Sequence, residues 1–154
     1  MPGTIRIVDT SVLCNILRVP TMDQDGERAA LELREALRQN DVLLLPIAVI
    51  YETGNHIAQN GDGRIRRDVA RKFVELVQKA FGGEVPFIPT PLHDPDEMLG
   101  WVAEFPDRAV EGVGFGDLSI RRIFERQCEL HHGRRVLIWS YDRHLQGYDQ
   151  AARL

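Results

Sequence analysis

The sequence predicts an α/β fold, a three-layer α/β/α sandwich with a short parallel sheet, and two observations support this prediction. Short apolar, β-branched runs alternate along the chain with amphipathic segments of ten or more residues. Strands alternating with helices of that length form parallel sheets covered on both faces. The 154 residues, 44% hydrophobic and 27% charged, contain neither an internal repeat nor a low-complexity linker. We therefore expect a single domain over residues 1–154.

Each element in the first half of the chain has a local signal. The run Ile5-Arg-Ile-Val is short and β-branched, and Asp9-Thr10-Ser11 can open a helix directly after it. Pro46 suits a first helical position, because its missing N–H would be unpaired there anyway. The expected elements are a strand at 4–8, helices at 9–17 and 25–40, a strand at 42–45 and a helix at 46–59.

Glycines and prolines divide the second half of the chain. Asn60-Gly-Asp-Gly63 and Gly82-Gly83 bound a helix, and Gly112 to Gly116 forms a flexible turn before the last one. Met98, Leu99 and Val102 are expected to face inward, and Trp101, Phe105 and Trp139 to belong to the core. The expected elements are a helix at 64–80, a strand at 85–88, helices at 95–105 and 117–132, and a strand at 136–139.

Composition narrows the functional classes. A formal net charge of −4 and a pI near 5.7 do not suit a protein that coats DNA through a general basic surface, although a local basic patch can still bind nucleic acid. Cys14 and Cys128 have no CxxC partner, which argues against a zinc site or a disulfide framework. With no apolar run of signal-peptide or membrane-spanning length, a cytoplasmic protein without membrane contact is expected.

Four acidic residues stand where an apolar run or a glycine turn ends: Asp9, Glu52, Asp117 and Asp142. The carboxyl ends of parallel strands share one edge of a sheet, so these side chains are expected to converge there. A cluster of like charges is costly without a cation, and Mg²⁺ or Mn²⁺ prefers oxygen ligands of this kind. The pattern therefore predicts a metal site.

Helix capping is the competing interpretation. Asp9, Asp117 and Asp142 each stand at an expected helix start, where a carboxylate can accept hydrogen bonds from unpaired backbone amides. Glu52 lies inside an expected helix and has no such explanation: it either faces solvent or is buried, and if it is buried it is expected to require the ion most. Hydroxyl neighbours, namely Thr10, Ser11 and Ser140, suit a supporting role in which they orient carboxylates or metal-bound water.

Four segments together resemble the acidic motifs of the PIN-domain nucleases. They are Ile7-Val-Asp-Thr-Ser-Val-Leu, Ile50-Tyr-Glu-Thr-Gly-Asn, Gly116-Asp-Leu-Ser-Ile and Ile138-Trp-Ser-Tyr-Asp, in the family's order and over residues 5–148. The length resembles that of the small VapC-type ribonuclease toxins. The long interval from Glu52 to Asp117, Tyr141 and the Gly114-Phe-Gly116 turn depart from the family pattern and bear on loop geometry and substrate choice.

The resemblance implies a function as well as a fold. It implies that Asp9, Glu52, Asp117 and Asp142 form the catalytic quartet around Mg²⁺ or Mn²⁺, with Asp9 and Asp117 as primary ligands. It further implies an RNA substrate, a homodimer and a small cognate antitoxin protein that covers the site. Hydrolysis by water would leave 5′-phosphate and 3′-hydroxyl ends.

Cationic residues in two groups are candidates to guide the RNA backbone. Arg64, Arg66 and Arg67 belong to the densest group, and Arg121 belongs to the second. A solvated helix face with Asp68–Lys72 and Glu75–Lys79 ion pairs explains the first group equally well. His56, one turn after Glu52, is more typical of a surface histidine than of a site residue.

Two other functions fit the same residues. One is a PIN-like DNA- or RNA-processing nuclease outside a toxin system. The other is a non-catalytic nucleic-acid-binding scaffold, which the retention of all four acids argues against, because a scaffold need not keep a repulsive cluster.

Overall fold

The computed structural model describes residues 2–91 and 93–153 and confirms the predicted α/β fold. Its described residues form a five-stranded sheet in the order β3-β2-β1-β4-β5. The first four strands in that order pair in parallel, and β5 runs antiparallel to β4 at one edge. The strands are β1 (Ile5–Val8), β2 (Val42–Leu45), β3 (Phe87–Pro89), β4 (Val136–Trp139) and β5 (Asp149–Gln150).

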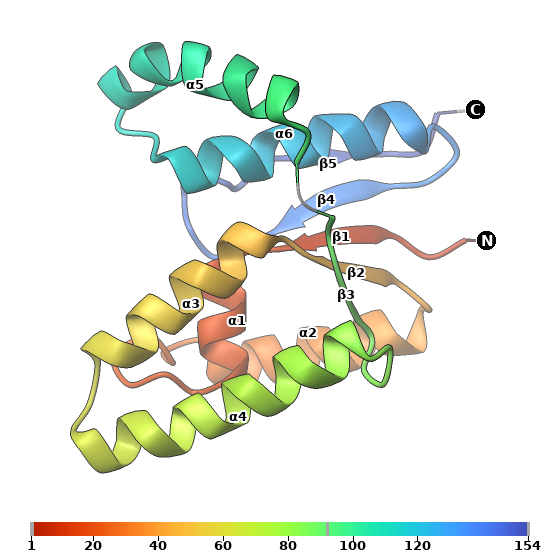
Figure 1. Cartoon of the computed structure of the whole chain (residues 1–154). Coiled ribbons are helices and arrows are strands. Elements are labelled where there is room, and N and C mark those ends of the chain that lie inside the picture. Colours follow the sequence, from red (N-terminus) through yellow and green to blue (C-terminus); the bar gives the residue numbers. More distant parts are fainter. Residues whose placement is uncertain (1, 92, 154) are drawn as a thin grey trace.

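Helices cover both faces of this sheet (Figure 1). On one face, α6 packs on β1 and β4, and α5 packs on the outside of α6. The other face carries the remaining helices, with α1 in contact with α2 and α3, and α3 in contact with α4. The helices are α1 (Thr10–Ile16), α2 (Gly26–Arg38), α3 (Ile47–Gln59), α4 (Gly63–Phe81), α5 (Pro95–Val110) and α6 (Phe115–Leu130).

The central strand β1 organises the core. Ile5, Ile7 and Val8 are at most 2% exposed, and β1 pairs with β2 on one side and β4 on the other. Burial on both faces explains why β2 and β4 are continuous apolar runs and why Arg6 is the one polar residue of β1. The amide of Asp9 donates to the carbonyl of Trp139, so the β1–β4 pairing continues to the carboxyl end of both strands.

The sequence-based boundaries of the first half and of β4 are close to those observed, and the differences lie elsewhere. The expected strand at 85–88 is β3, which begins at Phe87, and β5 was not predicted. The helix expected at 95–105 continues to Val110 through Pro106. Leu99 and Val102 are 65% and 51% exposed, so the prediction that they face inward is wrong.

These differences have a physical explanation. α5 packs on α6 and not on the sheet, so it has no buried side chain in the described chain, and Trp101 and Phe105 are only partly covered. Trp139, on β4, is buried as predicted. Pro106 normally disfavours a helix interior because it lacks an N–H and crowds the preceding turn. An exposed surface helix leaves room for that distortion.

An ion pair at the amino-terminal edge of the sheet shows how this fold treats a buried carboxylate. The side chain of Asp41 is 1% exposed and accepts hydrogen bonds from Arg6 Nε (2.7 Å) and from the Thr4 amide (2.8 Å). Its charge is therefore compensated directly. Removing one partner of such a pair leaves an uncompensated buried charge.

We predict that Arg6→Met lowers the free energy of unfolding by about 3 kcal/mol, because Asp41 stays buried without its cation. The matched control is Arg135→Met, which breaks the exposed Arg135–Asp149 pair (51% and 43% exposed side chains) and is expected to cost less than about 1 kcal/mol. Urea denaturation of both variants measures the difference. Equal losses would contradict the distinction between the two pairs.

Candidate active site

All four sequence-predicted acids meet at the carboxyl edge of the sheet. Asp9, Glu52, Asp117 and Asp142 line one pocket of about 140 Å³. They arrive there from the ends of β1 and β4 and from the helices α3 and α6, which begin beside that edge (Figure 1). The remaining lining residues are Thr10, Ser11, Met22 and His56.

Asp9 is the most constrained of the four. It is 3% exposed and caps α1, and its Oδ2 accepts from the Ser11 amide (3.3 Å) and the Ser11 hydroxyl (2.8 Å). Ser140 Oγ is 2.7 Å from the same oxygen and joins the end of β4 to the end of β1. Capping and site formation are therefore two roles of one side chain. Hydrogen bonds are present on Oδ2 alone among the described residues, which leaves Oδ1 available.

Glu52 is held against α6. Its Oε2 accepts from Thr10 Oγ1 at 2.8 Å, while its Oε1 lies against Gly116. A Cβ atom added to Gly116 would lie 1.9 Å from that oxygen, so any other residue at this position would displace the Glu52 carboxylate. Glu52 is half-buried, less buried than Asp9, so the expectation that its burial makes it the most dependent on an ion is wrong.

Asp117 and Asp142 do not cap helices as the competing interpretation expects. Asp117 lies inside the first turn of α6, whose N-cap is Gly114. Asp142 begins a turn, and its Oδ1 accepts from the His144 amide at 2.9 Å. The hydroxyl of Ser140 accepts from the Asp142 amide at 2.9 Å, which links this turn to Asp9.

The environment of Asp117 disfavours its charged form. Burial, followed by the negative charges of Asp9, Asp142 and Glu52, raises the pKa of this carboxyl to about 6, while His144 acts in the opposite direction. Within residues 2–91 and 93–153, none of the four acids forms an ion pair with a lysine, arginine or histidine. Asp41 is the opposite case, with Arg6 beside it.

The donor chemistry of the pocket fits a hard divalent cation, since all four ligands would be carboxylate oxygens. As the side chains stand in the described residues, no three His, Cys, Asp or Glu groups are close enough together to hold one ion. Asp9 and Glu52 each use one oxygen on hydroxyl groups and keep the other free. Ion binding would therefore require the carboxylates to draw closer together.

The predicted cationic groups have different surroundings. Arg64, Arg66 and Arg67 are exposed at the start of α4, and no ion pair involves them in the described chain. Of the two pairs expected on this helix, the described residues include Glu75–Lys79 (2.7 Å) but not Asp68–Lys72. Arg121 instead donates to the His144 carbonyl (2.9 Å) and lies over the Tyr148 ring. These two contacts hold Arg121 against the loop that follows Asp142.

Two residues of the acidic pocket, His56 and Met22, have no strong signal in the sequence. His56 lies one helical turn after Glu52, a spacing that signals a shared face but that surface histidines show equally often. Met22 comes from the segment between α1 and α2, where no motif marks it. Only the folded path of that segment brings it to the acids.

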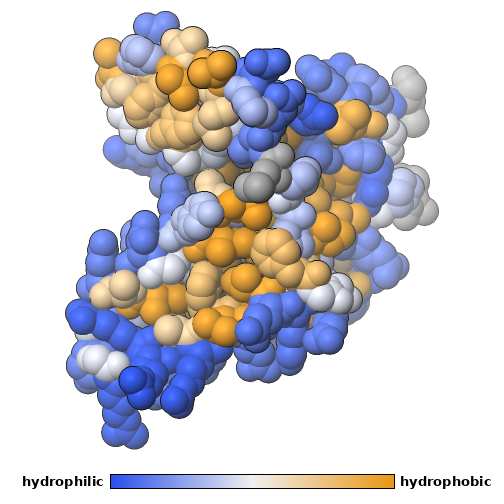
Figure 2. Space-filling model, in the orientation of Figure 1, coloured by the Kyte–Doolittle hydropathy of each residue, from blue (hydrophilic) through white to orange (hydrophobic). Residues whose placement is uncertain are grey.

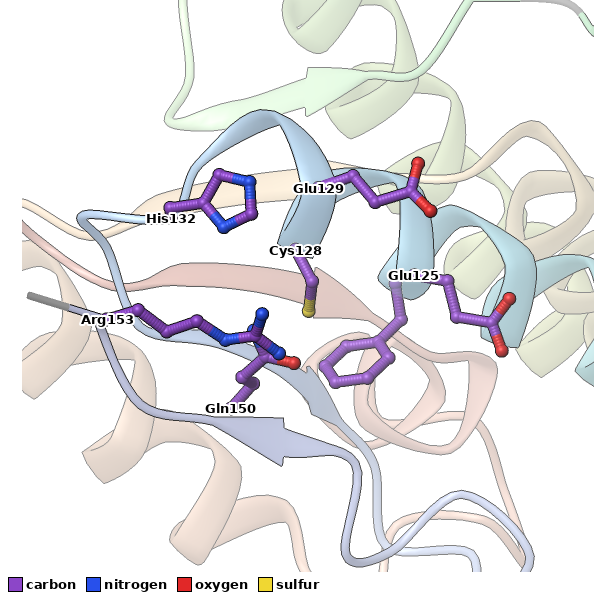
Figure 3. A pocket seen from close by; sticks show the side chains of 7 residues that line it. Glu125, Cys128, Glu129, His132, Gln150 and Arg153 are labelled. Atoms are coloured by element: carbon purple, nitrogen blue, oxygen red, sulfur yellow. The ribbon is translucent and has the colours of Figure 1, made fainter.

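A separate pocket of about 330 Å³ lies between the end of α6 and β5 and contains none of the four acids (Figure 3). Its lining includes Cys128, His132 and Arg153. Burial raises the pKa of the Cys128 thiol, which Arg153 opposes, so this thiol stays protonated at neutral pH. Cys14 and Cys128 are both buried free cysteines.

Comparison with known proteins finds no matching family model, no matching curated protein and no matching solved structure. Within the described chain, no helix combines the length and apolar character needed to cross a bilayer.

We predict that Asp117→Asn stabilises the protein at pH 7.5 in the presence of a chelator, raising the Tm by about 2–5 °C. The folded-state pKa of Asp117 is above its ordinary value of 3.8, so the folded state is penalised increasingly as pH rises from about 4 to 6. The gain should therefore disappear near pH 4. Differential scanning calorimetry at both pH values measures it.

The control for this experiment is Asp107→Asn, a change at an exposed position on α5. It should leave the Tm unchanged at either pH. A lower Tm for Asp117→Asn at pH 7.5 would show that the charge of Asp117 stabilises the metal-free fold, contrary to the electrostatics of this pocket.

Proposed function

We propose that the protein is a metal-dependent endoribonuclease that hydrolyses RNA phosphodiester bonds and resembles the PIN-domain nucleases. One observation carries the proposal: four carboxylates line one small pocket with no cationic side chain of the described residues paired to them. The buried Asp41 of the same protein, in contrast, is neutralised by Arg6. Leaving four uncompensated is costly for stability and suits a site that binds Mg²⁺ or Mn²⁺.

In this proposal Asp9 and Asp117 are the primary ligands, and Asp142 and Glu52 complete the set. A divalent cation held there would lower the pKa of a bound water and stabilise negative charge on the phosphate. The chain's own hydroxyls have a positioning role: Ser11 and Ser140 fix one oxygen of Asp9, and Thr10 fixes one oxygen of Glu52. The second oxygen of each of these two carboxylates has no hydrogen-bond donor among the described residues.

The exposed arginines of α4 supply a path for the RNA backbone in the same proposal. Thr21 Oγ1 donates to Asn60 Oδ1 at 2.7 Å, which ties the segment before α2 to the loop that opens α4. Met22, the next residue after Thr21, lines the acidic pocket. One hydrogen bond thus links the loop before Arg64, Arg66 and Arg67 to the segment that contains Met22.

The toxin assignment, with its homodimer and its small antitoxin, belongs to the proposal and rests on the resemblance alone. A neighbouring reading frame that encodes a short DNA-binding protein would support it. Co-purification of this chain with that protein, and loss of RNA cleavage in the complex, are the outcomes the toxin assignment requires.

We predict that Asp9→Asn reduces Mg²⁺- or Mn²⁺-dependent RNA cleavage by about 100-fold or more, because it removes a metal ligand. The circular dichroism spectrum and Tm should stay near those of the parent, since an amide oxygen can still accept from Ser11 and Ser140. Product ends should carry 5′-phosphate and 3′-hydroxyl groups. Asp107→Asn is the matched control and should cleave normally.

Unchanged cleavage by Asp9→Asn would refute the metal assignment. Cyclic phosphate products would refute attack by water. Loss of the folded spectrum would assign Asp9 a purely structural role.

A second prediction concerns substrate binding by α4. Reversing two charges in Arg66→Glu/Arg67→Glu should raise the apparent KM for RNA about tenfold and weaken its dependence on salt, because fewer counterions are released on binding. The value of kcat should change little. The control Arg34→Glu/Arg38→Glu makes the same charge change at exposed positions on α2.

Equal effects of the two double variants would indicate a response to net charge alone. Unchanged kinetics for Arg66→Glu/Arg67→Glu would remove these residues from the substrate path.

A further inference from the structure

A second, mainly apolar pocket of about 360 Å³ adjoins the acids. Ile47, Ala48 and Tyr51 of α3 form one wall, and Phe115, Gly116 and Ser119 of α6 form the opposite wall, with His93 and Met98 completing the lining. In the orientation of Figure 1, hydrophobic residues gather across the middle of the molecular surface, between the upper and lower helices (Figure 2). The volume falls in the range of about 300–1,000 Å³ found for small-molecule sites.

The two pockets share no lining residue, but their linings come into contact between Gly116 and Glu52. Gly116 lines the apolar pocket, and the position of its absent Cβ is 1.9 Å from Glu52 Oε1, an atom of an acidic-pocket residue. Tyr51 precedes Glu52, and Gly116 precedes Asp117, so each wall of the apolar pocket continues directly into one of the acids. A ligand with a charged group at the acids can therefore place an adjoining flat, apolar group in this pocket.

The lining suits a planar aromatic ligand. Tyr51 is 70% exposed at the pocket, which leaves its ring face free to stack. Phe115 is fixed by an edge contact with Phe105, 5.4 Å between ring centroids, and His93 by an edge contact with Trp101, 4.3 Å between centroids. Burial lowers the pKa of His93, so at neutral pH its ring offers one donor and one acceptor to a polar edge.

We propose that this pocket binds an unpaired nucleobase of the RNA, next to the phosphate that occupies the acidic pocket, with Tyr51 as the stacking platform. The inference rests on the proposed ribonuclease function and deepens it, because it assigns a single-stranded substrate and a specificity site. Single-stranded bases are recognised by stacking on aromatic side chains, whereas a paired base cannot leave its helix without cost. The base adjoining the cleaved bond is then read by α3 and α6.

Binding of a fluorescent single-stranded RNA, measured by anisotropy, tests the pocket separately from cleavage. The parent for this assay is Asp117→Asn, which removes one proposed ligand and prevents turnover. Adding Tyr51→Ala should weaken binding about 5- to 100-fold, the range for loss of one stacked base, and Tyr51→Phe should retain it. Ala48→Leu, which fills the pocket from α3, should weaken binding as Tyr51→Ala does.

Two controls locate the effect. Phe81→Ala removes another exposed aromatic ring (62% exposed), one that is outside the pocket lining, and should not change binding. A series of RNAs, each with one abasic site at a different position, locates the stacked base. At one position the missing base should lower the affinity, and Tyr51→Ala should cause no further loss with that RNA. An identical RNA in duplex form should bind without dependence on Tyr51.

The outcomes separate the two proposals. Binding that depends on Tyr51, in a protein whose native form cleaves no RNA, would keep the base pocket and refute the nuclease. Cleavage with binding indifferent to Tyr51→Ala and Ala48→Leu would refute the pocket and keep the nuclease. Absence of RNA binding would also refute the pocket. A third contrary outcome is that Tyr51→Ala or Ala48→Leu changes the oligomeric state, measured by light scattering, without changing RNA affinity. That outcome would indicate that the apolar surface contacts protein instead of RNA.

Discussion

Mutual repulsion among four carboxylates at one edge of the sheet is the constraint on which the rest of the site depends. Burial and three neighbouring negative charges raise the pKa of Asp117 to about 6, and no cationic side chain of the described residues pairs with the set. The surrounding fold holds these groups in place by hydrogen bonds and close packing instead of by opposite charge. Ser11 and Ser140 fix Asp9, Thr10 fixes Glu52, and Gly116 allows α6 to approach Glu52.

Outside the candidate site, the same fold pairs a buried acid with a cation. At the amino-terminal edge of the sheet, Arg6 Nε lies 2.7 Å from Asp41 Oδ2. At the carboxyl edge, the four acids of the candidate site have no cationic partner among the described residues. Uncompensated charge lowers the stability of the free protein, and a bound ligand can restore that stability. The difference between the two edges therefore favours a ligand-binding site at the carboxyl edge. The adjoining apolar pocket, which continues from Glu52 and Asp117 through Tyr51 and Gly116, gives the same edge a surface for a flat group beside the charged one.

The sequence predicted the parts of the fold whose signals are local and strong. β2 and β4 are apolar runs, β1 is apolar apart from Arg6, and the helices before β3 have clear periodicity or caps, so their bounds were close. β3 carries Pro89 and lies next to β2, where a proline is tolerated because the strand is at the edge of the sheet. β5 spans two residues and depends on pairing with β4, so it had no sufficient local signal. The start of α5 at Pro95 was predicted, but its end was not, because the helix continues through Pro106.

The candidate site was predictable in its acids and not in its surroundings. The order of strands and helices was enough to place Asp9, Glu52, Asp117 and Asp142 together. Burial depends on the packing of the complete chain, which explains why Asp9 and not Glu52 is the most enclosed acid. His56, Met22 and the pocket beside Tyr51 combine segments far apart in sequence, and only the folded chain reveals them.

Anomalous diffraction from a crystal grown with Mn²⁺ tests the central claim most directly. The account predicts an anomalous peak within about 2.0–2.3 Å of carboxylate oxygens of both Asp9 and Asp117. A peak confined to other residues, or none at a Mn²⁺ concentration that saturates cleavage, would contradict it.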